Sequence, residues 1–217
     1  MRAMFDTIAP RYDLVNRVMT FGLDRLWRRR TVEALDLAPG STVLDVACGT
    51  GDLCRDLDDA GHRPVGVDLS PGMLRHARTR APLVLADAAR LPAPDRSVDG
   101  AVSGFALRNF VALEAVFAEL ARVVRPGGRV ALLDVATPAN PVLRAGHSVY
   151  FERVVPRIGA LLSDAGAYRY LPRSVAYLPP GDTICDLLEQ AGFGAVRRRL
   201  LSGGVTQLIT ATRRVLQ

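Results

Sequence analysis

The segment Thr42-Val43-Leu44-Asp45-Val46-Ala47-Cys48-Gly49-Thr50-Gly51 decides the fold. Apart from Asp45, its first half is apolar or β-branched and predicts a buried parallel strand. Gly49 and Gly51 then permit a tight turn in which no Cβ separates the backbone from a ligand. A helical pattern begins at Asp52, so the turn forms a helix N-terminus with free N–H groups and a positive dipole end. The segment lacks the third glycine of the G-x-G-x-x-G fingerprint and therefore disfavours a dinucleotide-dependent dehydrogenase.

A second acid follows the segment at a spacing that suits a nucleoside. Val65-Gly66-Val67-Asp68 predicts a short strand that ends in a carboxylate, and Asp68 lies about twenty residues beyond Gly49, where such folds hold a ribose diol. The alternative is an ordinary strand, turn and helix with a surface acid. Together the turn and Asp68 resemble class I S-adenosylmethionine methyltransferases. The resemblance implies an α/β fold with a Rossmann-like seven-stranded sheet, mostly parallel with a C-terminal antiparallel hairpin and with helices on both faces. It also implies S-adenosyl-L-methionine as the cofactor.

Length and composition indicate a single globular domain over residues 1–217. The 217 residues are 49% hydrophobic, contain no evident linker and suffice for a full α/β core. No apolar run reaches the ~18 residues of a membrane span, and the N-terminus lacks the apolar core of a signal peptide. The three cysteines have no metal-ligand spacing, so we expect no metal and a reduced, cytoplasmic setting.

The positive charge comes from arginine alone. The net charge is +6 and the chain has no lysine, which excludes lysine Schiff-base chemistry and a Walker-type phosphate loop. Two basic clusters, Arg29-Arg30 and Arg197-Arg198-Arg199, suit either solvated faces or attraction to an acidic membrane or nucleic acid. We favour solvated faces because no aromatic residues interleave with the clusters. The chain also lacks a base-flipping motif of the Asn/Asp-Pro-Pro-Tyr type, so nucleic acid is not an expected partner.

Hydrophobic periodicity predicts alternating helices and strands. Helical pieces over 4–19, interrupted at Pro10, and a helix from Leu23 to near Pro39 form an N-terminal cover over residues 1–40. The expected strands are 42–46, 64–68, 83–86, 98–103 and 129–135, followed by a hairpin of 195–202 and 205–212. The expected helices between them are 52–60, one that starts at Pro71, 112–123 and 182–191. Residues 138–180 hold all but one of the five tyrosines and predict a helical insertion over the acceptor side.

Several further segments resemble one narrower family. They are Met4-Phe5-Asp6-Thr7-Ile8-Ala9-Pro10-Arg11-Tyr12-Asp13, Gly22-Leu23-Asp24-Arg25-Leu26-Trp27-Arg28, Val155-Pro156-Arg157-Ile158-Gly159 and Tyr168-Arg169-Tyr170-Leu171-Pro172-Arg173-Ser174. All are similar to the quinone-biosynthesis C-methyltransferases of the UbiE/MenG type, and the similarity covers nearly the whole chain. It implies an enzyme that methylates a ring carbon of a prenylated hydroquinone, most simply demethylmenaquinol.

Two departures from that family leave the acceptor open. Gly104 stands where the family usually has serine, and the last strand, Gly204 to Arg213, lacks the family's histidine. The alternative is a paralogous methyltransferase that acts on another aromatic small molecule, such as a secondary metabolite. A protein of this fold that binds the cofactor without catalysis is disfavoured by Asp68, Asp87 and the pair Arg108-Asn109.

The resemblance also implies the site residues. The cofactor-binding residues are expected to be Asp45, Gly49, Thr50, Gly51, Asp68, Leu69, Asp87, Ala88 and Gly104. Asp87 follows the third strand, where methyltransferases commonly hold the adenine amino group, and a turn cap is its alternative role. The implied catalytic residues are Arg108, Asn109 and Tyr12. Arg108 would stabilise the phenolate of the acceptor or order a water that takes its proton, with Tyr12 and Asn109 orienting the ring; a structural ion pair is the alternative for Arg108.

The expected partners follow from the acceptor. A prenylated aromatic acceptor leaves peripheral contact with the membrane open, and a homodimer is open as well. His147 lies in the insertion and could serve as a base, but an isolated histidine is more often a packing or surface residue, so we leave it outside the site. The expected location is the cytoplasm, with or without peripheral contact with the membrane.

Overall fold

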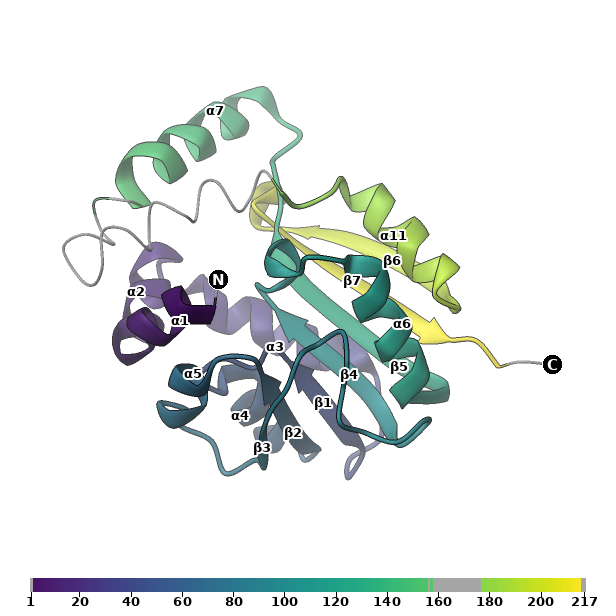
Figure 1. Ribbon diagram of the computed structural model, residues 1–217. Coiled ribbons are helices and arrows are strands. Elements are labelled where there is room, and N and C mark those ends of the chain that lie inside the picture. The colour runs from purple at the N-terminus through teal and green to yellow at the C-terminus, as the bar shows by residue number, and fades with distance from the viewer. Residues whose placement is uncertain (1, 156, 158–176, 216–217) are drawn as a thin grey trace.

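A central sheet organises the computed structural model, which describes residues 2–155, 157 and 177–215. Seven strands lie in the order β3-β2-β1-β4-β5-β7-β6 (Figure 1). They are β1 (Thr42–Val46), β2 (Arg63–Asp68), β3 (Leu83–Leu85), β4 (Val98–Gly104), β5 (Val124–Val135), β6 (Phe193–Leu201) and β7 (Thr206–Arg213). The first five strands run parallel, and β7 is antiparallel to both β5 and β6. The predicted sheet, with its antiparallel C-terminal hairpin, is confirmed.

Helices precede, connect and follow the strands. Ahead of the sheet lie α1 (Arg2–Ile8), the 3-10 turn η1 (Ala9–Arg11), α2 (Tyr12–Met19) and α3 (Leu23–Leu35). The connections contain α4 (Asp52–Asp59), α5 (Pro71–Arg75), the turn η2 (Leu107–Asn109), α6 (Leu113–Val123) and α11 (Gly181–Gln190). After β5 come α7 (Pro141–Val149) and a π-helical turn, η3 (Tyr150–Val154), and η4 (Ser202–Gly204) joins β6 to β7. The break predicted at Pro10 is confirmed, since that residue lies in η1 between two helices.

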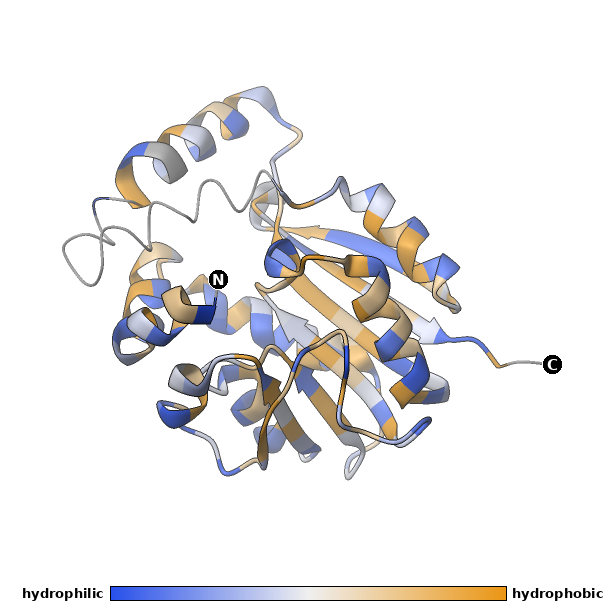
Figure 2. Cartoon of the chain, in the orientation of Figure 1, coloured by the Kyte–Doolittle hydropathy of each residue, from blue (hydrophilic) through white to orange (hydrophobic). Residues whose placement is uncertain are grey.

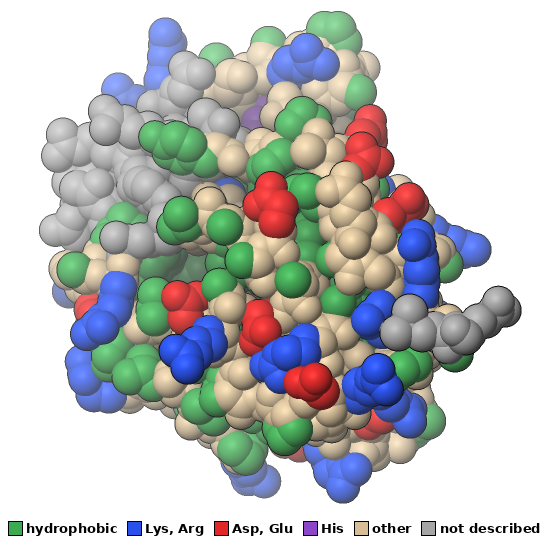
Figure 3. Space-filling view, turned by 45° about the vertical axis from the view of Figure 1, so that its right-hand side comes forward, with side chains coloured by type: hydrophobic (Ala, Val, Ile, Leu, Met, Phe, Trp, Pro, Cys, Tyr) green, Lys and Arg blue, Asp and Glu red, His purple; other side chains and the backbone are tan. Residues whose placement is uncertain are grey.

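The core has one layer on each face of the sheet. Phe117 of α6 and Ile184 of α11 pack on one face, together with Leu44 of β1, and Leu35 of α3 and Leu57 of α4 pack on the other. Figure 2 shows that the hydrophobic residues follow the central strands between these layers. All five side chains are almost fully buried, and truncating a buried Phe or Leu typically costs about 2–5 kcal/mol. Outside, acidic and basic side chains are interspersed on the face that comes forward in Figure 3.

Several predicted segments differ from the structure in extent; α3, for example, ends at Leu35 and not near Pro39. β5 begins at Val124 rather than at 129, because Val124 pairs with Val98 before residues 125–128 bulge out and Arg129 resumes the ladder opposite Gly100. The predicted insertion at 138–180 contains α7 and η3, while its residues 156 and 158–176, including the Tyr168–Ser174 motif, lie outside the described part of the chain. Among the described residues, every helix is too short or too polar to cross a membrane.

Candidate active site

The site lies where the order of the strands reverses. β1 and β4 are neighbours in the middle of the sheet, and open α/β sheets bind ligands beyond the carboxyl ends of the strands at such a point. Ala47 follows β1 and Phe105 follows β4, and each has a left-handed backbone with φ of 59°. Residues other than glycine rarely adopt this conformation, because it strains the backbone. Residues that do adopt it often lie at ligand-binding sites. Two cavities meet at these two residues.

The smaller cavity has a volume of about 270 Å³ and collects most of the predicted cofactor residues. Asp68, Leu69, Asp87 and Ala88 all line it. The Asp68 carboxylate is fixed from both sides, because one oxygen accepts a hydrogen bond from Gly49 N (2.8 Å) and the other from Ser70 N (2.8 Å). Burial is the main cause that raises the pKa of Asp68. The acid at the end of β2 is therefore held against the glycine turn.

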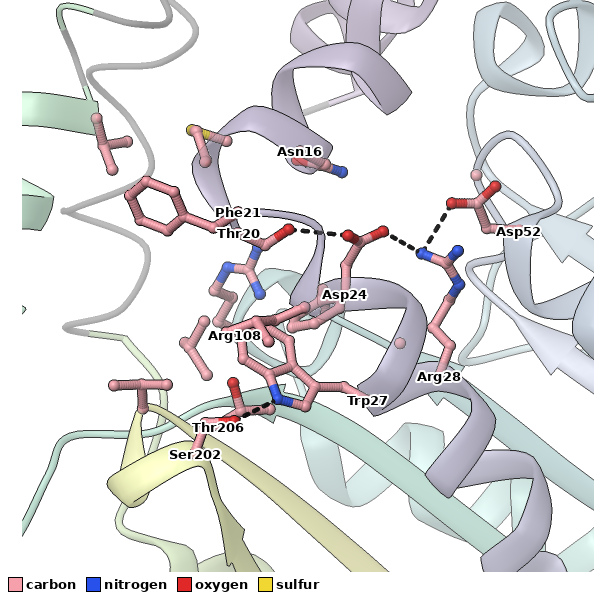
Figure 4. A pocket seen from close by; sticks show the side chains of 18 of the residues that line it. Asn16, Thr20, Phe21, Asp24, Trp27, Arg28, Asp52, Arg108, Ser202 and Thr206 are labelled. Carbon is pink, nitrogen blue, oxygen red and sulfur yellow. Dashed lines mark hydrogen bonds and ion pairs between the residues drawn. The ribbon is translucent and has the colours of Figure 1, made fainter.

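The larger cavity has a volume of about 520 Å³ and a mainly apolar wall. Its sides come from α2, α3, α7 and the turn η4, so segments far apart in the sequence enclose it. Arg108 points into this space beside Thr20, Trp27 and Thr206 (Figure 4). Arg108 thus lines the same cavity as Gly49 and Thr50 of the glycine turn.

Five residues line both cavities. They are Tyr12, Ala47, Gly49, Gly104 and Phe105. The two cavities therefore adjoin at these residues, and a ligand in the smaller cavity would lie next to a ligand in the larger one. Tyr12 forms a hydrogen bond with Asn16, and burial, the largest cause, raises the pKa of Tyr12. Its phenol consequently stays protonated and remains a hydrogen-bond donor at neutral pH.

Arg108 is also half of a buried ion pair. Its guanidinium contacts the Asp134 carboxylate, and Arg108 N lies 3.2 Å from the other carboxylate oxygen. Asp134 belongs to β5 and is fully buried. Within the described residues, Arg108 Nε has no hydrogen-bond partner. The ion pair given above as the alternative role of Arg108 is therefore present, and the residue still lines the larger cavity; its role toward the acceptor stays a prediction. The sequence offered one signal for Asp134, an acid near the end of a buried apolar strand, as at Asp45.

Asp45 is buried, and only one of its two carboxylate oxygens has a hydrogen-bond partner among the described residues. One oxygen accepts a hydrogen bond from Cys54 Sγ (3.3 Å), and the other has no partner among the residues that the structure describes. Burial, the largest cause, raises the pKa of Asp45 to about 7. The residue also lines the larger cavity beside Gly49. A buried acceptor of this kind suits a cationic or N–H donor brought by a ligand.

Two acids that the sequence analysis did not single out fix the N-terminal helices over the cleft. One oxygen of Asp6 in α1 accepts hydrogen bonds from Ser70 Oγ and Gly72 N, both at 2.7 Å. Asp13 of α2 accepts a hydrogen bond from the Thr50 hydroxyl. The glycine turn and the start of α5 are thereby tied to the cover formed by α1 and α2. Both acids lie in the N-terminal motif quoted above, which gave no role for them.

A network of ion pairs lies at one end of the larger cavity, where Asp24, Arg28 and Asp52 line it. Arg28 Nη1 contacts Asp24 (2.6 Å) and Asp52 (2.9 Å), while its Nε contacts Asp56 (2.9 Å). Trp27 Nε1 donates to Ser202 Oγ (2.9 Å), which joins α3 to the β6–β7 connection (Figure 4). A second guanidinium, that of Arg55, also contacts Asp52, so these ion pairs join α3 to α4 at this end of the cavity.

Some predicted residues occupy other places than expected. Gly51 lines neither cavity: its φ of 81° and the 2.7 Å that would separate a Cβ from Thr79 Cγ2 make it a turn residue at the start of α4. Asn109, expected beside the acceptor, lines the smaller cavity instead. His147 lines the larger cavity, and burial lowers its pKa. Ile209, where the family's histidine is missing, is fully buried in the core, so that departure does not alter the acceptor cavity. In the described part of the chain, no cluster of His, Cys, Asp and Glu suits a metal ion.

Comparison with known proteins gives one consistent result. The model of the ubiE/COQ5 methyltransferase family matches residues 1–213. The ubiquinone/menaquinone biosynthesis C-methyltransferase UbiE of Syntrophotalea carbinolica is 42% identical over 98% of this chain and 93% of its own length. The demethylmenaquinone methyltransferase of Thermus thermophilus is 43% identical over 94% of this chain and 97% of its own.

Solved structures agree on the fold. An S-adenosylmethionine-dependent methyltransferase from Thermotoga maritima superposes with a TM-score of 0.70, 19% identity and coverage of 99% of this chain and 100% of its own. A phosphoethanolamine N-methyltransferase of Haemonchus contortus, solved with S-adenosylhomocysteine, gives a TM-score of 0.66 at 15% identity, over 87% of this chain and 52% of that one.

Proposed function

The chain belongs to the ubiE/COQ5 methyltransferase family, and we propose that it transfers the methyl group of S-adenosyl-L-methionine to a ring carbon of a prenylated hydroquinone, most simply demethylmenaquinol. One observation carries the proposal: the cavity lined by Asp68, the acid that we assign to the ribose, shares a wall with a larger apolar cavity that contains the Arg108 guanidinium. The relatives' names support the acceptor, since those quoted above methylate quinone precursors. The runner-up, another aromatic acceptor, rests only on the departure at Gly104, and the names of the relatives do not favour it.

The residues present fit the cofactor. Two buried acceptors, Asp45 Oδ1 and Asn109 Oδ1, have no hydrogen-bond partner among the described residues, and each belongs to one of the two adjoining cavities. We assign the ribose to Asp68, the adenine side to Asp87 and Ala88, and the ammonium end of the methionyl group to Asp45. When bound, S-adenosylmethionine would supply a methyl group on a cationic sulfonium, and the carboxyl groups of Asp45 and Asp68 would complement the positive charge of the ligand when ionised.

We assign to Arg108 the role of binding the hydroxyl group of the acceptor. Methylation of a ring carbon is favoured when the neighbouring phenol is ionised, and a guanidinium in a low-dielectric cavity stabilises the phenolate. Asp134 holds Arg108 through the ion pair and the backbone N–H, so the donor needs little reorganisation. Tyr12 donates from the shared wall and orients the ring at the point where the cavities meet. Asn109 is assigned to the cofactor side.

Closure of the site excludes water. The contacts of Asp6 and Asp13 hold α1 and α2 across the glycine turn, and Tyr12 lies at the start of α2. Binding that keeps reactants in line and dry contributes much of the rate enhancement in methyl transfer of this kind. The N-terminal cover therefore has a direct part in catalysis.

A product assay tests the proposal. Purified protein is incubated with methyl-labelled S-adenosylmethionine and short-chain demethylmenaquinol under a reductant, and the lipid extract is examined by mass spectrometry. The expected result is a gain of one methyl group on the naphthoquinol ring. Label that appears only in water-soluble aromatics from a cell extract would overturn the proposed acceptor and favour the runner-up.

Two statements about assembly remain proposals. A prenylated acceptor is dissolved in the bilayer, so we propose peripheral contact with the membrane. The homodimer stays a prediction, and light scattering of the purified protein checks it.

A further inference from the structure

An exposed corner of the molecule stands at the mouth of the larger cavity. We call it the α2–α3 corner and define it as residues 14–29, from the first turn of α2 to the second turn of α3. At its tip Phe21 is 78% exposed and has a left-handed backbone, with φ of 52°. Gly22 N bonds to Arg17 O (2.9 Å) and closes the end of α2, a cap in which glycine usually takes the left-handed position. An aromatic residue is thus held in a strained, solvent-exposed position.

The apolar groups of the corner continue into the cavity. Leu14, Val18 and Leu26 are exposed along the two helices, while Phe21 and Leu23 are both partly exposed and part of the cavity wall. The Phe21 ring lies 5.7 Å from the ring of Tyr150, which lines the same cavity from η3. Exposed apolar groups of this kind mark a surface that meets another phase or partner. An apolar path therefore runs from solvent to the acceptor position.

Arginines flank these apolar groups. Arg17, Arg25 and Arg29 of the corner line a separate hollow of about 650 Å³, whose wall contains seven arginines and three aspartates. Within the described residues, none of these three guanidiniums has a carboxylate within 4.0 Å. The wall of this hollow thus has an excess of positive charge, to which Arg17, Arg25 and Arg29 of the corner contribute. The face shown in Figure 3 differs, because acids and bases are interspersed there.

We propose that the α2–α3 corner is the surface by which this enzyme docks on an anionic lipid bilayer. Phe21 and its apolar neighbours enter the headgroup region, Arg17, Arg25 and Arg29 face the lipid phosphates, and the cavity mouth opens toward the acyl chains. The inference rests on the proposed function, because a prenylated acceptor reaches the cavity most directly from the bilayer. The arginines and the exposed apolar side chains of the corner both lie near the mouth of the larger cavity, through which such an acceptor would enter.

The other basic cluster provides a matched control. Arg197 and Arg199 are exposed on β6, the strand at the edge of the sheet. Neither residue lines any of the three cavities described here. Their replacement by glutamate changes the net charge as much as the pair Arg25→Glu and Arg29→Glu. The variant Arg25→Glu/Arg29→Glu leaves the acceptor and cofactor cavities untouched, because neither residue lines them.

Co-sedimentation of the full chain with lipid vesicles tests the docking surface. We expect binding to vesicles of phosphatidylcholine with phosphatidylglycerol, weak binding to phosphatidylcholine alone, and a loss of affinity with added salt. Each arginine near the surface contributes roughly fivefold, so Arg25→Glu/Arg29→Glu should bind at least ~25-fold more weakly. The β6 variant should bind like the wild type. Equal binding to neutral vesicles, equal loss in the two variants, or no binding by the wild type would overturn the proposal.

A second measurement separates this inference from the proposed function. Turnover of a water-dispersed short-chain acceptor should be the same in Arg25→Glu/Arg29→Glu and wild type, whereas turnover of a long-chain acceptor in anionic vesicles should fall with the vesicle affinity. Equal turnover of the vesicle-borne acceptor would contradict the docking surface. Absence of methyl transfer in the wild type, with vesicle binding intact, would contradict the proposed function and leave the docking surface standing.

Discussion

Replacing Asp45 by asparagine tests the electrostatics of the glycine turn. The side chain is fully buried, and its unused oxygen has no partner within the described chain. Burial raises its pKa to about 7, against an ordinary value of 3.8. The ligand-free protein therefore contains a carboxyl group that resists ionisation. Asparagine keeps the shape and an oxygen that can accept the hydrogen bond from Cys54, and it removes the titration.

The two pKa values give the sign and size of the effect. Well below pH 3.8 the group is protonated in both the folded and the unfolded state, so it does not make the free energy of unfolding depend on pH. Between that value and about 7 only the unfolded chain ionises it, so the free energy of unfolding falls as pH rises and levels off above about 7. At about 1.4 kcal/mol per pH unit, the wild type loses ~3 kcal/mol through Asp45 between about pH 5 and about pH 8. Asp45→Asn lacks this loss.

Urea titrations of the ligand-free protein at both pH values measure the effect. The stability of Asp45→Asn relative to the wild type should rise by ~3 kcal/mol between about pH 5 and about pH 8. Calorimetry should show S-adenosylhomocysteine binding at least about tenfold weaker, because a charged acceptor is lost. Asp59→Asn, at the exposed end of α4, is the control and should change neither quantity. A variant whose stability depends on pH exactly as the wild type's does would refute the reasoning.

Three further predictions concern separate parts of the site. Asp68→Asn should weaken S-adenosylhomocysteine binding ~10–100-fold by calorimetry, because its carboxylate holds the glycine turn and is assigned the ribose; unchanged affinity contradicts that assignment. Arg108→Met should lower methyl transfer about 10²–10³-fold and leave S-adenosylhomocysteine affinity within about twofold. It should also destabilise the protein, since Asp134 stays buried; adding Asp134→Asn should restore stability without restoring turnover, and recovered turnover would reduce Arg108 to a structural role. Gly72→Ala should speed proteolysis of the N-terminal segment, because a Cβ would lie 2.6 Å from Asp6 Oδ1 and displace α1; an unchanged cleavage rate would show that this contact does not hold the cover.

Local patterns in the sequence predict most of the fold because each one reports a near-neighbour interaction. The apolar run at 42–46 and the pattern at 112–123 correspond closely to β1 and α6. The helix predicted to start at Pro71 is α5, and the hydroxyl of the preceding Ser70 caps it by accepting a hydrogen bond from Met73 N (3.0 Å). The predicted start of β5, residue 129, lies five residues after the observed start at Val124. Val124 pairs with Val98, and local sequence patterns do not show such contacts between strands.

The site was predicted less completely, since its geometry depends on contacts between distant segments. Residues with a spacing signal, such as Gly49 and Asp68, lie together as expected. Asp134 lies 26 positions from Arg108, and its partnership with that residue appears only when β5 lies beside β4. Asn109 follows Arg108 directly in η2, yet the turn sends the two side chains to different cavities. A single family motif could not separate their roles.

A crystal structure of the protein with S-adenosylhomocysteine tests the central claim most directly, namely that one bend after β1 holds the nucleoside in the smaller cavity beside the acceptor. We predict that the ribose hydroxyls lie within hydrogen-bond distance of the Asp68 carboxylate and that the sulfur faces the wall shared by Tyr12 and Gly104. A nucleoside bound elsewhere, for instance in the arginine-lined hollow beside α3, would contradict it.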